Sequence, residues 1–289
     1  MDAKFLPAQA AIRADQPEEL EQLIRADSTL ATDRSLSAGD HPTLLCCLVL
    51  EMPARRELDR LIRLFSEQGA ELTEALTAAA SINNTTAITT LLDLGVPIAG
   101  DRSWSPLDEA LYWGHADSVE FLVKHGAPID NIRKYAALGH LDGIRRCFGD
   151  AGLIVETAGE VDWPFGNSIE PTIRSDPQQI TNHALIYACA WGQLDSANEL
   201  ITHGAEINAI PAGFDFAGTP LHYAALNNRR EMVEWLLSQG ADPTIRDTKV
   251  QNTPDGWADY ARHRQLAQLL HTARETWPTS HRNEMKFAP

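Results

Sequence analysis

Apolar residues recur at helical spacing in stretches that open and close with a turn residue. The stretches 83–95, 114–126, 192–204 and 228–240 begin with Gly or Asn, end with Gly, and share one interval of twelve positions. The apolar positions inside three of them are Val119, Phe121 and Leu122; Ala197, Leu200 and Ile201; and Met232, Val233, Leu236 and Leu237. This spacing predicts a short amphipathic helix in each stretch, with the closing glycine as its left-handed cap.

A second short helix is predicted before each of these stretches, because Ser/Thr-Pro signals occur there. The signals are Ser105-Pro106-Leu107, Thr219-Pro220-Leu221 and Thr253-Pro254-Asp255. Proline suits the first helical position, where its missing N–H would have no intrahelical partner. The pattern predicts short helices in antiparallel pairs with no regular sheet. It also predicts that Leu221, Ala224, Leu236 and Leu237 are buried.

The best-formed repeat runs from Gly218 to Pro243. It reads Gly-Thr-Pro-Leu-His-Tyr-Ala-Ala over residues 218–225, continues through Met-Val-Glu-Trp-Leu-Leu over 232–237, and ends in Gly240-Ala241-Asp242-Pro243. This unit resembles the ankyrin repeat over its whole length. Residues 105–130 match nearly as well, with Asp108 in place of the usual His. The resemblance implies an all-α ankyrin-repeat solenoid of about eight helix pairs.

The helix pairs form a single array in this interpretation, with an insertion and a tail. The repeats are expected at about 5–35, 41–72, 73–101, 102–130, 131–148, 182–210, 214–245 and 250–275. Residues 149–181 fit no repeat period and form an irregular insertion, either a long loop or a distorted half-repeat. Pro164, Pro171 and Pro177 are expected to limit helices there, which makes this the least protected interior segment. Residues 276–289 form a polar tail.

The net charge of the chain indicates which class of partner it binds. Lys and Arg number 24 against 40 Asp and Glu, which gives a formal net charge of −16. Such a surface repels phosphate backbones, so we expect no nucleic-acid partner and favour a protein with a basic patch. The longest charge-free run, 75–92, carries eight Ser, Thr or Asn residues and cannot span a bilayer.

The remaining composition favours a monomer in the cytoplasm. The four cysteines have no metal-ligand or C-x-x-C spacing and are interpreted as thiols in a reducing compartment. The first fifteen residues do not form a signal peptide.

Candidate catalytic chemistry is sparse, although the chain has ten histidines. No H-E-x-x-H, P-loop, G-x-G-x-x-G or G-x-S-x-G motif occurs. The resemblance implies structural roles for His115, His140 and His222, which would bond to neighbouring backbone. We therefore predict no catalytic residue, no metal site and no cofactor.

Large aromatic residues supply the candidate binding site. In the ankyrin pattern, the residues just before the Gly-His turn and those before Thr-Pro-Leu face the concave surface. The positions predicted to contact a partner are Trp104, Tyr112, Trp113, Leu138, Trp191, Phe214, Phe216 and Asn227. Rigid aromatics of this kind are frequent binding hot spots. Asp108, Glu109 and Asp215 nearby are expected to set the association rate.

Two hypotheses of function follow. The first is a non-enzymatic scaffold or inhibitor that binds a protein partner through a concave aromatic and acidic face. The alternative is an enzyme or small-ligand receptor whose site forms where residues 149–181 fold over that face, lined by Trp163, Phe165 and Trp191. Because a fold does not specify a function, the first hypothesis depends on the surface pattern.

Overall fold

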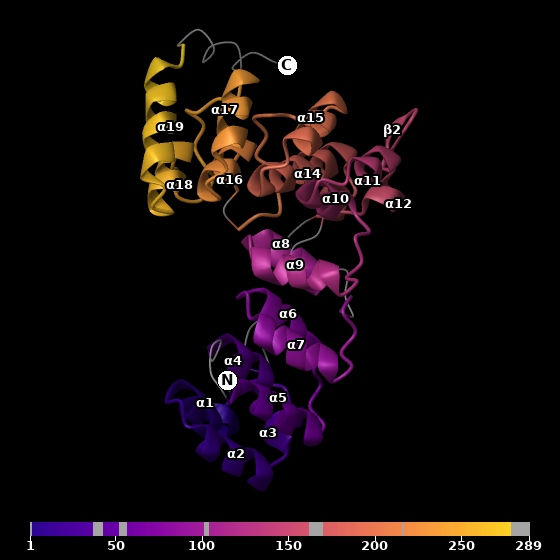
Figure 1. Ribbon diagram of the computed structural model, residues 1–289, viewed down its shortest axis with the longest axis vertical. Helices are drawn as coiled ribbons and strands as arrows, with labels where there is room; N and C mark the ends of the chain where they lie inside the picture. Colours follow the sequence, from indigo (N-terminus) through magenta and orange to yellow (C-terminus); the bar gives the residue numbers. More distant parts are fainter. Residues whose placement is uncertain are drawn as a thin grey trace. The chain divides into compact units, whose positions relative to one another are not determined.

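The structure of the chain is a computed structural model that describes residues 2–36, 43–51, 57–100, 104–161, 170–215 and 217–278. The chain divides into two compact units, Met1–Pro128 and Ile129–Pro289, called here the first and the second unit. Each unit consists of helix pairs whose members are joined by short turns (Figure 1).

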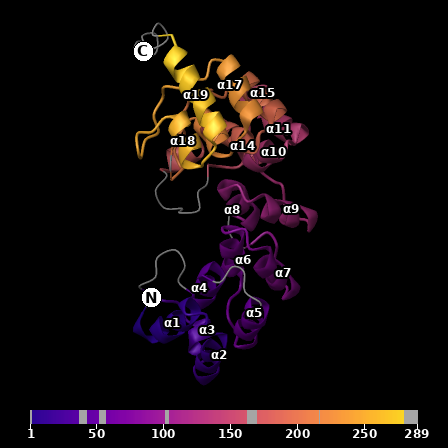
Figure 2. The same cartoon turned by 60° about the vertical axis from the view of Figure 1, so that its left-hand side comes forward.

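The first unit contains four helix pairs, whose first helices contact one another in series (Figure 2). The pairs are α1 (Leu6–Arg13) with α2 (Pro17–Ala26), α4 (Leu44–Glu51) with α5 (Leu58–Glu67), α6 (Thr73–Ala80) with α7 (Thr85–Asp93), and α8 (Pro106–Trp113) with α9 (Ala116–Lys124). The short helices η1 (Ala3–Phe5) and α3 (Thr29–Thr32) flank the first pair.

The second unit contains four more pairs with the same order of contacts. They are α10 (Ile132–Leu138) with α11 (Leu141–Arg146), α14 (Pro177–Trp191) with α15 (Leu194–Thr202), α16 (Pro220–Leu226) with α17 (Arg230–Ser238), and α18 (Pro254–Tyr260) with α19 (Arg264–Thr276). Helices α10, α14, α16 and α18 contact in that order. The all-α class and the eight pairs expected from the sequence are confirmed.

Left-handed backbone joins the two helices of most pairs. Gly114, Gly139 and Gly192 each have φ of 74°, while Asn83 and Asn228 have φ of 58° and 55° at the same place in their repeats. Glycine adopts this conformation without a steric cost, and asparagine tolerates it better than most residues. The turn residues recognised in the sequence therefore mark where the chain reverses between helices.

A side-chain cap fixes the first helix of the best-formed repeat. The Nδ1 atom of His222 accepts a hydrogen bond from the Thr219 N–H at 3.1 Å and lies 2.8 Å from the Thr219 hydroxyl. Its Nε2 atom lies 3.2 Å from the carbonyl oxygen of Asn252 in the next repeat. Burial lowers the pKa of His222 to about 4, so the ring is neutral at pH 7.

The insertion contains more regular structure than the sequence predicts. A short antiparallel hairpin pairs two strands of two residues each, β1 (Phe148–Gly149) and β2 (Gly152–Leu153). It is followed by two short helices, α12 (Val155–Ala158) and α13 (Pro171–Arg174). Pro171 and Pro177 each occupy the start of a helix, where proline is favoured, so neither helix extends before its proline, but the segment is more helical than expected. Helix α14 consequently begins at Pro177, before the repeat boundary expected at 182.

The described part of the insertion also packs on the second unit. Ala158 and Val161 are buried in its hydrophobic core, and the Val161 N–H donates to the Arg174 carbonyl at 2.8 Å. The expectation of an unprotected segment therefore fails for these residues. Trp163, Pro164 and Phe165 lie outside the described residues.

Three of the four core positions predicted in the best repeat are buried. Leu221, Ala224 and Leu236 are almost completely inaccessible to solvent. Leu237, which was predicted with them, is only half-buried and packs at the edge of the same core. Leu236 and Leu237 thus form a matched pair of neighbouring leucines that differ in burial.

We expect Leu236→Ala to lower the free energy of unfolding by about 2–5 kcal/mol, as truncation of a fully buried leucine does. Leu237→Ala should cost clearly less, because part of its side chain already contacts water. Urea denaturation of both variants measures the difference. Equal losses would show that the buried face of α17 is assigned wrongly.

The buried His222 should make stability depend on pH. Its pKa is about 4 in the folded chain and 6.5 in the unfolded chain, so its contribution is complete above pH 6.5 and is lost as the pH falls towards 4. Between these values the unfolding free energy of the wild type should fall more steeply than that of His222→Asn, by about 1.4 kcal/mol per pH unit. Urea titrations at several pH values test this. Parallel curves would contradict it.

Candidate functional site

Helix α8 is fixed at both ends by its own sequence. The Asp108 N–H donates to Ser105 Oγ at 3.2 Å, and the Ser105 N–H donates to Asp108 Oδ2 at 3.1 Å, which completes a capping box. Gly114 ends the helix in left-handed backbone. Glu109, Tyr112 and Trp113 occupy positions i, i+3 and i+4 between these caps, so they lie on one face of the helix.

The Glu109 carboxylate accepts hydrogen bonds from two tryptophans. Trp113 Nε1 donates to Glu109 Oε1 at 2.7 Å, and Trp104 Nε1 donates to Glu109 Oε2. Only 6% of Glu109 is exposed. One buried side chain therefore fixes the orientation of two indoles, one from α8 and one from the segment before it.

Tyr112 completes the cluster of rings. Its ring lies edge-on to Trp104, with 6.0 Å between centroids and 71° between planes, and to Trp113, with 5.1 Å and 88°. Trp104 is 8% exposed, Tyr112 is half-buried and Trp113 is 44% exposed. We call Trp104, Glu109, Tyr112 and Trp113 the α8 cluster.

The charge of the α8 cluster is concentrated on Glu109. Burial raises the pKa of this carboxyl, and the nearby Asp108 carboxylate acts in the same direction, whereas the two indole N–H groups oppose the shift. Among the residues that the structure describes, no Lys, Arg or His forms an ion pair with Glu109. The carboxylate is therefore held by neutral donors.

Trp191 is the main candidate in the second unit. It is the last residue of α14 and is partly exposed. The Arg229 guanidinium lies over its ring at 5.9 Å from the centroid, and Arg229 Nε donates to the Ala190 carbonyl at 2.9 Å. Leu138, at the same place in α10, is half-buried. Arg229 thus contacts one face of the Trp191 indole.

Phe214 lies in the interior of the second unit. It is 8% exposed and stacks on His183 with 4.5 Å between ring centroids, while Tyr223 lies 5.1 Å away. Asn227 is partly buried and its Nδ2 donates to the Tyr223 carbonyl at 2.9 Å. Phe216 lies outside the described residues.

A family profile of ankyrin repeats in three copies matches residues 50–133 and again 168–247, more than half of the chain. The chain belongs to the ankyrin-repeat family. Ankyrin repeats are protein-interaction modules that stack in series and present extended binding surfaces. The resemblance stated from the sequence is thereby confirmed.

Several larger proteins share these ankyrin repeats. Palmitoyltransferase AKR1 of Eremothecium gossypii is 33% identical over 101 residues, which are 34% of this chain and 13% of that protein. The ankyrin repeat and LEM domain-containing protein 1 homolog of Caenorhabditis elegans is 36% identical over 74 residues, 26% of this chain and 10% of its own. The E3 ubiquitin-protein ligase hecd-1 of Caenorhabditis elegans is 26% identical over 171 residues, 58% of this chain and 5% of its own. This chain thus spans a small part of each relative, and the activities in these names are those of the relatives.

The structure corrects the exposure expected for several site residues of this ankyrin-repeat protein. Trp104 and Phe214, which were expected to face the surface, are buried. Asp108 and Glu109, which were expected to act as exposed charges, are buried as well, one in the cap of α8 and one beneath the indoles. Trp113 keeps the largest exposed fraction among the described candidates.

The central role of Glu109 was not predicted from the sequence. The signal was present in part, because Glu109 precedes Trp113 by four residues and therefore lies on the same face of α8. The bond from Trp104 could not be derived in this way, since that residue precedes the helix and its position depends on the fold.

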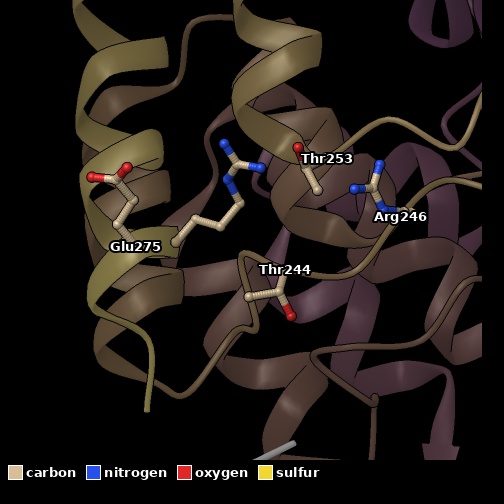
Figure 3. A pocket seen from close by; sticks show the side chains of 5 residues that line it. Thr244, Arg246, Thr253 and Glu275 are labelled. Atoms are coloured by element: carbon tan, nitrogen blue, oxygen red, sulfur yellow. The ribbon is translucent and has the colours of Figure 1, made fainter. Parts of the chain in front are cut away.

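A second candidate site is a polar hollow of about 500 Å³ in the second unit (Figure 3). It is lined by Thr244, Arg246, Thr253, Arg274 and Glu275. Arg274 Nη2 lies 2.9 Å from Asp255 Oδ2, so one of the two guanidiniums is already paired. Glu275 also lines the hollow, so two carboxylates, Asp255 and Glu275, nearly compensate the charges of the two guanidiniums.

The described residues contain neither a metal-binding cluster nor a membrane-spanning helix. Over the described ranges, no group of three or more His, Cys, Asp or Glu side chains is placed to hold a metal ion. Within the same part of the chain, no helix is both long enough and apolar enough to cross a bilayer.

Glu109 should give the stability of the chain a second dependence on pH. Its pKa is raised in the folded chain above the usual 4.5, so its favourable contribution is complete at lower pH and is lost as the pH rises through 4.5 towards the folded pKa. Relative to the wild type, Glu109→Gln should therefore become more stable as the pH rises from 4 to 7. Urea denaturation across this range tests the trend. A constant difference would show that Glu109 ionises as it does in water.

Proposed function

We propose that this chain is a non-enzymatic ankyrin-repeat scaffold or inhibitor that binds a protein partner through the α8 cluster. The observation that carries the proposal is Trp113, a large indole that is 44% exposed yet oriented by its hydrogen bond to Glu109. A pre-oriented aromatic loses little conformational entropy on binding. Tryptophan is also enriched among residues that dominate interface energies.

The net charge of −16 supports a partner with a basic surface. Opposite charges speed the encounter of two proteins and orient them before the close contacts form. Aromatic residues that become buried in the complex contribute to the final affinity. Charges at the rim of the interface mainly change the association rate and its dependence on salt. We propose that the partner meets the α8 cluster with a basic segment.

Trp191 and Leu138 are proposed as contacts in the second unit. Each is partly exposed just before the glycine that ends its helix, as Trp113 is before Gly114. Because Arg229 packs over the Trp191 indole, Trp191 also contributes to packing within the unit. We expect its truncation to affect stability as well as binding.

We further propose that the chain acts as a monomer in the cytoplasm. The four cysteines are free thiols, and Cys46, Cys147 and Cys189 are buried. Burial raises the pKa of the Cys46 thiol to about 12 and that of Cys147 to about 11, which keeps both protonated and unreactive. Such thiols suit a reducing compartment.

Trp113→Ala should weaken partner binding by about 2 kcal/mol or more, the range of an interface hot spot. Partner captured from native cytosol on immobilised wild type is identified by mass spectrometry, and its affinity for each variant is then measured. Tyr260→Ala is the control, because Tyr260 is an aromatic residue of the second unit that is 84% exposed.

Thermal melts of the same variants distinguish a binding residue from a core residue. Trp113→Ala should unfold close to the wild-type temperature while its partner affinity falls. Unfolding many degrees earlier would assign Trp113 to the core and remove the basis of the proposal. Equal losses of affinity for Trp113→Ala and Tyr260→Ala would also contradict the proposal, because the effect would not be specific to the α8 cluster.

A further inference from the structure

The Glu109 carboxylate is a buried negative charge whose described neighbours are neutral donors and another acid. Each of its oxygens accepts one indole N–H, from Trp113 and from Trp104. A buried carboxylate without a cation is costly, because neutral hydrogen bonds replace only part of the lost hydration. Among the residues that the structure describes, no cation compensates this charge, so a cation from a partner would stabilise it.

The hydrogen-bonding capacity of Glu109 is only partly used. An ionised carboxylate offers about four acceptor positions, two on each oxygen. One indole occupies one position on each oxygen of Glu109. Each oxygen thus has an acceptor position that its indole does not use.

The rings of the α8 cluster are suited to the same ligand. The indole N–H edges of Trp104 and Trp113 point at Glu109. The planes of Tyr112 and Trp113 meet at 88° with centroids 5.1 Å apart, which forms an edge-to-face corner, and Trp113 bonds to the carboxylate. The faces of such rings attract ammonium and guanidinium groups.

We propose that the α8 cluster binds one basic side chain, lysine or arginine, of the protein partner. This rests on the proposed function and names the chemical group that the site recognises. The aliphatic part of the basic side chain packs on the exposed Trp113 ring, and its charged end lies at the corner of Tyr112 and Trp113 next to Glu109. Glu109 then acts as the counter-ion and the indoles hold it in place.

The first test uses small cations with the full chain. Butylguanidinium and butylammonium represent the two basic side chains, and butylurea is a neutral analogue of nearly the same shape. The readout is the NMR signals of the indole N–H groups of Trp104 and Trp113, assigned with Trp→Phe variants, at constant ionic strength. Either cation should shift both signals saturably, while butylurea should not.

This comparison uses the unaltered protein, so its result does not depend on how a variant folds. If butylguanidinium and butylammonium both leave the two signals unchanged, the proposal is wrong. Shifts of equal size with butylurea would also overturn it, since the site would then recognise shape and not charge. A shift with one cation only would support the proposal and identify the side chain.

The second test asks whether the charge of Glu109 is required. Glu109→Gln keeps the size and one acceptor but removes the charge, and it should weaken cation binding about tenfold, which corresponds to loss of one charge-assisted contact. Tyr260→Ala should bind as the wild type does. Arg102 is the basic residue nearest to Trp104 in the sequence, so the titrations are repeated with Arg102→Gln as a control.

Partner affinity separates this inference from the proposed function. Loss of affinity in both Trp113→Ala and Glu109→Gln supports both. If only Trp113→Ala loses affinity, the α8 cluster is still the binding surface, but the proposal that it binds a basic side chain is wrong. Unchanged affinity in both variants overturns the proposed function, and the inference with it.

Discussion

A helix of seven to ten residues is too short to be stable alone in water, and most helices of this chain have that length. Each pair is therefore stable only because it buries one side against the next pair. The contact series α1–α4–α6–α8 and α10–α14–α16–α18 show this dependence within each unit. The capping boxes of Ser105 and Thr219 and the left-handed turn residues hold the short helices in register for that packing.

The features that repeat could be predicted from the sequence, while the features that occur once could not. Gly114, Gly192 and Asn228 occupy one conformation in three repeats, so their spacing located the helix ends. The start of α14 at Pro177 was not predicted, because proline both ends and begins helices, and here the Gln178 N–H donates to Asp176 Oδ1 to cap a helix start. The bond from Trp104 to Glu109 spans only five residues, but Trp104 precedes α8, so helical spacing gives no signal for it.

The same position in different repeats serves different purposes. Five residues before the turn residue, the best-formed repeat has Tyr223 in its core, and the repeat of α8 has Glu109. A leucine at 109 would avoid the cost of a buried charge, but it would leave the Trp104 and Trp113 N–H groups without their acceptor. Glu109 thus lowers the stability of the first unit but fixes the orientation of two indoles.

Helices α10 and α14 pack directly on each other although residues 139–176 separate them in the sequence. The cost of closing a connection grows only slowly with its length, so contact between the helices, and not the linker, determines that they are neighbours. The part of the connection that follows α11 therefore carries elements of its own, such as α12 and α13, and it contributes Ala158 and Val161 to the core. An engineer could exploit this independence by grafting a reporter or a second binding loop at the β1–β2 turn, with the repeat stack left as it is.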